Sequence, residues 1–157
     1  MKISEEVLKP LSTSDWEVRF LSKKNQFPSD IISRYPWIDN NLIDLICNLD
    51  IAEKKNQKKW LLSINDYSNK SNSPYTWNEW ESQSIKAAED DQEWIKEIKN
   101  FWNENFPIAY SVENGYSYLS LRRNGQIFFG EEPEYEDATL FAQSYKEAIH
   151  KISNGEF

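Results

Sequence analysis

FPIAYSVENGYSYLSLRRNGQIFF, residues 106–129, is the stretch that decides the fold. It holds three runs rich in β-branched and aromatic residues, at 108–112, 116–122 and 126–129. An Asn-Gly pair separates each run from the next, at Asn114-Gly115 and Asn124-Gly125. Asn-Gly between such runs is the strongest short-range hairpin signal, because a type I′ turn requires positive φ at both central residues. Two such turns in succession predict an antiparallel meander.

The residues after the meander predict a fourth strand and a final helix. Residues 138–142 have the length and composition of a strand. Ser144 and Glu147 have capping-box spacing, in which each side chain satisfies an exposed N–H group at the start of a helix. We expect this helix to run to about Ile152, because Gly155 follows it as a stop signal.

The residues before the meander are mostly helical in pattern. Residues 77–103 predict a long helix whose buried stripe includes Trp94 and Trp102, and a break near residues 88–91 stays open. Pro107 ends it, since the residue before a proline disfavours helix. Nearer the N-terminus the segments are short: helices at 3–11, from 27–30 onward and at 42–49, an undecided segment at 15–21, a polar connector at 53–59, a strand at 60–64 and a loop at 65–74.

Helices followed by a contiguous antiparallel sheet indicate the α+β class. We expect a single domain over residues 1–157, because one core usually serves roughly 100–200 residues. Its antiparallel sheet should have about four to six strands and be flanked by helices. Seven Trp, eight Tyr and eight Phe supply much of the apolar surface for the core.

The negative charge is unevenly distributed along the chain. Residues 1–60 carry a net charge of +1 and residues 61–157 a net charge of −9. An acidic half repels phosphate groups, so we expect no nucleic acid partner. It favours a basic protein partner and speeds the encounter with it. The alternative is that the surplus acid only keeps the protein soluble.

The sequence gives no catalytic constellation, so we expect a protein that is not an enzyme and has no catalytic residues. The one histidine, His150, lies near the end of the last predicted helix, and Cys47 lies on an apolar helix face, where a structural thiol is expected. No Cys or His pair has ligand spacing and no glycine-rich phosphate loop occurs, so no metal and no cofactor are predicted. A hydrolase would instead require carboxylates that converge in a deep polar pocket.

The single cysteine excludes an intramolecular disulfide, which favours a reducing compartment. Residues 1–10 contain acids and no apolar run, so no signal peptide is expected. No stretch approaches the ~18 apolar residues of a membrane span. We therefore expect a cytoplasmic protein without a membrane partner, and its oligomeric state stays open.

Two features are candidates for partner binding. The first is the acidic loop, residues 131–137, in which five acids surround one tyrosine and one proline: Glu131, Glu132, Glu134, Tyr135, Glu136 and Asp137. Burying five like charges would be prohibitive, so we expect a surface loop that engages Lys and Arg, with Tyr135 as an aromatic anchor. The alternative is a connecting loop without consequence. The second is Trp77, which we expect to be an exposed anchor beside the polar loop.

Short motifs in the C-terminal third carry a family resemblance. They are Phe106-Pro107-Ile108-Ala109-Tyr110, Gly115-Tyr116-Ser117-Tyr118-Leu119-Ser120-Leu121, Gly125-Gln126-Ile127-Phe128 and Ala142-Gln143-Ser144-Tyr145. Together they resemble the SUKH superfamily, which includes bacterial immunity proteins and the yeast regulator of cell-wall glucan synthesis. Phe27-Pro28 is similar to the Leu-Pro helix entry of that family and residues 60–64 to its first strand. The chain departs from the family at Asn48-Leu49-Asp50, where Asn-Gly is common, and at Tyr145, where Phe is usual.

The resemblance implies an α+β domain without enzymatic residues. It implies an immunity protein, an antitoxin that binds and neutralises a cognate polymorphic toxin, commonly a nuclease. An acidic inhibitor suits that role, because it can occupy a basic cleft in place of the phosphate backbone. The alternative is a non-enzymatic regulatory or scaffold protein that binds host proteins, like the yeast relative.

Overall fold

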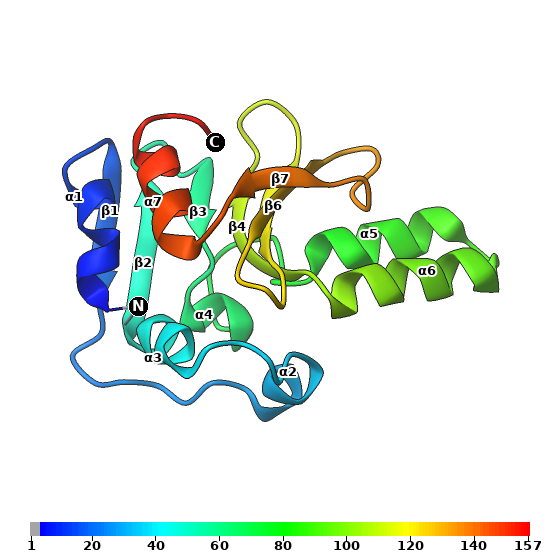
Figure 1. Cartoon of the computed structure of the whole chain (residues 1–157), viewed down its shortest axis with the longest axis horizontal. Helices are drawn as coiled ribbons and strands as arrows, with labels where there is room; N and C mark the ends of the chain where they lie inside the picture. The colour runs from blue at the N-terminus through cyan, green and yellow to red at the C-terminus, as the bar shows by residue number, and fades with distance from the viewer. Residues whose placement is uncertain (1–3) are drawn as a thin grey trace.

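The structure, a computed structural model, describes residues 4–157 and contains one open antiparallel sheet (Figure 1). Within these residues seven strands pair in the order of the chain. They are β1 (Trp16–Phe20), β2 (Leu49–Lys54), β3 (Lys59–Leu61), β4 (Phe106–Ser111), β5 (Ser117–Leu121), β6 (Ile127–Glu131) and β7 (Thr139–Ala142). The predicted α+β class is confirmed, and the sheet is one strand larger than the expected range.

Both predicted hairpins form, but with a different turn. β4 pairs with β5 and β5 with β6, each antiparallel. Gly115 and Gly125 have φ near 89°, whereas neither preceding asparagine has positive φ. The carbonyl of Arg122 accepts the N–H of Gly125, and the carbonyl of Gln126 accepts the N–H of Arg122. The type I′ prediction is therefore wrong, because the left-handed conformation falls on the glycine alone, as in the longer hairpin loops that close with a glycine.

β1 and β2 are the strands that the sequence pattern did not resolve. β1 forms from the undecided segment 15–21, and β2 covers residues that we expected at a helix end and in the connector 53–59. β2 pairs with β1 on one side and with β3 on the other. Its strand conformation therefore depends on partners distant in the chain, which a local pattern does not encode.

The described residues form seven α-helices and one 3₁₀ turn. They are Glu5–Leu8 (3₁₀), α1 (Lys9–Ser12), α2 (Ser29–Arg34), α3 (Asn40–Asn48), α4 (Ile64–Tyr67), α5 (Glu79–Ala88), α6 (Gln92–Asn103) and α7 (Tyr145–Ser153). The predicted helix 3–11 is thus a 3₁₀ turn followed by α1, and its residue 3 lies outside the described residues. α1 and α7 lie together at one side of the sheet, while α5 and α6 run side by side and project from it (Figure 1).

One face of the sheet is built from aromatic side chains. Trp60, Tyr110 and Tyr118 are register partners on β3, β4 and β5, so they lie side by side on the same face. The ring of Tyr110 lies 5.0 Å from that of Trp80 on α5, and the ring of Tyr118 lies 4.9 Å from that of Trp102 on α6. The α5–α6 pair therefore packs on this aromatic face through Trp80 and Trp102.

The helix predicted over residues 77–103 is two helices, α5 and α6, and they are separated near residues 88–91, where the sequence analysis allowed a break. Asp91 caps α6, because its carboxylate accepts the N–H of Trp94 at 3.0 Å. Trp102, near the end of α6, is buried as predicted. Trp94 was predicted to be buried, but 45% of its surface is exposed. That prediction is wrong because the start of α6 projects beyond the sheet, where no further layer covers it (Figure 1).

Candidate functional site

The acidic loop, residues 131–137, connects β6 to β7 and has an outer and an inner side. Its outer side is made of exposed residues: Glu131, Glu132, Pro133, Glu134 and Asp137. Its inner side is made of Tyr135 and Glu136, which contact α5 and α6. The expectation that all five acids stand free at the surface is therefore wrong for Glu136, and four carboxylates remain outside.

Tyr135 fixes the loop to the protein. Only 5% of its surface is exposed, and its ring stacks on Trp80 of α5 at 5.3 Å and 12°. Its hydroxyl donates to Oε1 of Gln83 at 3.2 Å, and its main-chain carbonyl accepts the hydroxyl of Tyr118. The ring of Tyr135 is therefore not available as the aromatic anchor for a partner that we expected, because it is buried against α5.

Glu136 is held by two neutral donors from the helical pair. Its carboxylate accepts hydrogen bonds of 2.8 Å from Oγ of Ser84 and from Nε1 of Trp102. Burial raises the pKa of Glu136, and these two hydrogen bonds act in the opposite direction. Glu136 thus positions the loop from inside.

The outer carboxylates keep their charge available. Glu132 accepts the N–H of Tyr116 at 2.6 Å, which joins the loop to the β4–β5 turn. Within residues 4–157 no salt bridge involves a residue of the acidic loop. The exposed acids therefore form a negative surface whose backbone is fixed and whose charge no neighbouring cation in that part of the chain neutralises.

Trp77 lies in the core and not at the surface. It is 9% exposed, and its ring lies 6.3 Å from that of Tyr35 and 6.2 Å from that of Tyr67. Its main-chain carbonyl accepts the hydroxyl of Tyr110. The prediction of an exposed anchor is wrong because the segment before α5 crosses the aromatic face of the sheet, and Trp77 packs into it.

A row of aromatic rings leads from the acidic loop to a cavity. Trp80 stacks on Tyr116 at 4.9 Å and also contacts Tyr75 at 5.6 Å. The ring of Tyr75 lies 5.9 Å from that of Trp60 on β3. Tyr75 and Tyr116 are half-buried, so this row reaches the surface between the loop and the cavity. Sequence reasoning missed both tyrosines, because no periodic pattern marks residues that come together from a loop and a turn.

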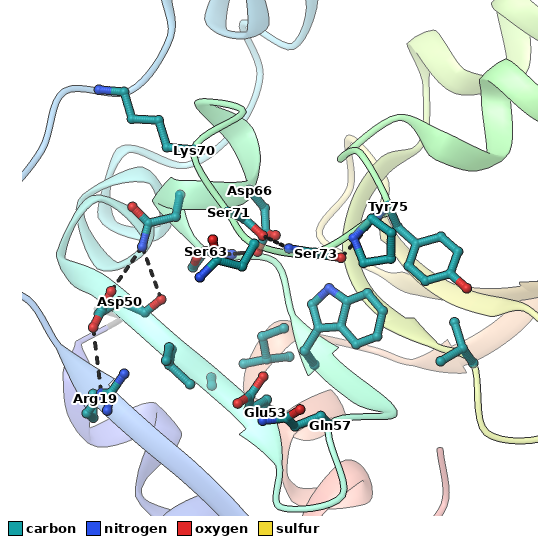
Figure 2. Close-up of a pocket in the computed structure, with 18 residues that line it drawn as sticks. Arg19, Asp50, Glu53, Gln57, Ser63, Asp66, Lys70, Ser71, Ser73 and Tyr75 are labelled. Carbon is teal, nitrogen blue, oxygen red and sulfur yellow. Dashed lines mark hydrogen bonds and ion pairs between the residues drawn. The ribbon is translucent and has the colours of Figure 1, made fainter.

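The cavity has a volume of about 640 Å³ (Figure 2). Its floor is formed by β2 and β3, and its wall by the Asn/Ser-rich segment 70–75. Figure 2 shows Ser63, Asp66 and Ser71 together at one side and Glu53 at another. A cavity of this size is in the range of small-ligand sites. The polar loop was the one sequence signal for it.

The acids of the cavity differ in how they are held. Asp50 accepts Nδ2 of Asn65 at 3.0 Å and pairs with Nε of Arg19 at 3.6 Å. Asp66 is buried and accepts the N–H of Ser63 at 2.8 Å, and burial raises its pKa. Burial, followed by the charge of nearby Glu17, raises the pKa of Glu53. The cavity therefore contains carboxylates that are partly desolvated.

Cys47 and His150, the residues that nucleophilic chemistry would most readily use, lie on different helices, α3 and α7. Cys47 is buried, and burial raises the pKa of its thiol, so the structural assignment of this residue fits. His150 lies exposed on α7. Among residues 4–157 no three His, Cys, Asp or Glu side chains gather in a way that could hold a metal ion. No helix in the same residues has the length and apolar character needed to span a bilayer.

Comparisons with family models, with curated proteins and with solved structures found no match to this chain. The likeness to the SUKH superfamily therefore stays a prediction that depends on the short motifs quoted for it.

Proposed function

We propose that this chain is an immunity protein that binds and neutralises a basic toxin domain through the outer side of the acidic loop. One observation carries the proposal: four exposed carboxylates stand on a backbone that Tyr135 and Glu136 fix from inside. A fixed charged surface binds with less loss of conformational entropy than a flexible loop of the same composition. A nuclease is the class of toxin that fits best, because its cleft is built to hold phosphate charges.

The acidic loop would act in two ways. Its field would steer a cationic partner and raise the association rate, an effect that salt screens. The half-buried rings of Tyr75 and Tyr116 beside it would supply apolar contact area, which aromatic residues often provide at interfaces. The partner would therefore cover the loop and the aromatic row together.

The test uses a charge reversal with a matched control. In the first variant, Glu131, Glu134 and Asp137 are changed to Lys. In the control, three exposed acids of the projecting helical pair, Asp90, Glu93 and Glu97, are changed to Lys, which alters the net charge equally. Glu132 stays unchanged, because it bonds the β4–β5 turn.

Tagged wild-type protein and both variants are used to capture partners from the native host, and the partner is identified and titrated by calorimetry. We expect the loop variant to bind at least about 10²-fold more weakly than the wild type and to lose protection against the toxin, since rim charges and steering each contribute. The control should bind within about threefold of the wild type. Equal binding by wild type and loop variant would overturn the proposal. A captured host protein without toxic activity would favour the regulatory alternative.

A further inference from the structure

Trp60 is the largest aromatic side chain that lines the cavity. It lies on the floor of the cavity and is 9% exposed, and its buried indole N–H has no acceptor among the described residues. Because this N–H is enclosed, an occupant of the cavity would meet the ring of Trp60 and not its N–H group.

The charges around the cavity favour a cation. Arg19 is already paired, with Asp50 at 3.6 Å and Glu17 at 3.9 Å. Lys70 also lines the cavity, but its side chain extends away from Glu53 and Asp66 (Figure 2). Glu53 and Asp66 form no salt bridge within residues 4–157. Two carboxylates thus line the cavity without a salt bridge of their own, and an anionic occupant would meet repulsion. Glu53 is the more exposed of the two, because Asp66 is buried and accepts hydrogen bonds from the N–H and the hydroxyl of Ser63.

The aromatic rings favour a planar cation over a compact one. Trp60 and Tyr75 line the cavity beside these acids, with their ring centroids 5.9 Å apart. A guanidinium group is planar, stacks on aromatic faces and binds carboxylates through two parallel N–H groups, whereas an ammonium group is a compact point charge.

We propose that this cavity is a receptor site for an arginine side chain, with Glu53 and Asp66 as the acidic partners and Trp60 as the stacking ring. The inference depends on the proposed function, because it assigns that arginine to an extended segment of the basic partner. A volume of about 640 Å³ accommodates such a segment and not only its guanidinium group. The row through Tyr75 and Tyr116 connects the cavity to the acidic loop, so one partner could contact both.

The direct test requires no partner. N-acetyl-arginine amide is titrated into the isotope-labelled protein, and the indole N–H signal of Trp60, assigned by its loss in Trp60→Phe, is followed by NMR. We expect saturable shifts at Trp60 and in residues 70–75 with a Kd below about 10 mM. N-acetyl-citrulline amide, which has the same shape without the charge, should bind at least about tenfold more weakly, and the lysine analogue should be intermediate. Equal binding of the citrulline analogue, or no saturable shift, would refute the site.

Glu53→Gln separates the site from the acidic loop. This variant should weaken arginine-amide binding at least about fivefold, while Glu97→Gln on α6 should leave it unchanged. A thermal melt by circular dichroism confirms that both variants are folded. In the partner assay, Glu53→Gln should weaken binding about tenfold. Loss of partner binding in the loop variant, without an effect of Glu53→Gln in either assay, would overturn the arginine site and leave the proposed function standing. The reverse pattern would overturn the acidic-loop interface alone.

Discussion

Replacement of Tyr135 by alanine tests whether the acidic loop is fixed from inside. The ring is buried against Trp80 at 5.3 Å in a stacked arrangement. Removing a buried aromatic ring usually costs about 3–5 kcal/mol, through lost apolar transfer and a cavity. The stacked pair contributes ~0.5–1.5 kcal/mol of this and the hydroxyl bond to Gln83 about 1 kcal/mol. We therefore expect Tyr135→Ala to lower the free energy of unfolding by about 4 kcal/mol.

Urea unfolding followed by far-ultraviolet circular dichroism measures this loss as a lower midpoint at an unchanged slope. Tyr135→Phe is the matched control, because it keeps the ring and removes only the hydroxyl bond to Gln83, so it should cost about 0.5–1 kcal/mol. A cost below about 1 kcal/mol for Tyr135→Ala would contradict the reasoning, since an exposed ring would behave in that way.

Three further predictions concern other contacts within the protein. Arg34 on α2 makes a bidentate pair with Glu81 on α5, with N–O distances of 2.8 and 2.7 Å. Glu81→Gln should therefore lower the free energy of unfolding by about 3 kcal/mol. A double-mutant cycle with Arg34→Met, measured by urea unfolding, should show a coupling energy above about 1 kcal/mol. Gly130→Ala should cost at least about 2 kcal/mol in the same assay, because a Cβ there would lie 2.5 Å from ring carbons of the buried Tyr118, and a neutral result would refute this. Glu136 has a higher pKa in the folded state than in the unfolded state, so its protonated form contributes stability at low pH. As the pH rises from about 4.3 to the raised folded pKa, the free energy of unfolding of the wild type should fall relative to that of Glu136→Gln. Stability profiles that stay parallel over that range would contradict this prediction.

Local signals in the sequence determined the C-terminal half of the fold. Asn-Gly pairs fixed two hairpins, because glycine adopts positive φ without strain. Ser144 caps α7 as its spacing predicts, accepting the N–H of Glu147 at 3.1 Å. The carboxylate of Glu147 reaches the N–H of Gln143 instead of that of Ser144. These features depend on residues within a few positions of one another, so the sequence contains all the information that they need.

Tertiary structure alone decided β1, β2 and the character of the candidate site. Tyr135 and Trp77 stand in polar surroundings in the sequence, yet they are buried because α5 and its preceding segment cross the aromatic face. Nothing in the sequence distinguishes Glu136 from its acidic neighbours, yet in the structure it is half-buried and accepts hydrogen bonds from Ser84 and Trp102. The cavity joins Glu53 and Asp66 from separate elements. Burial depends on which distant segments meet, and a local pattern carries the propensity of a residue but not the identity of its neighbours.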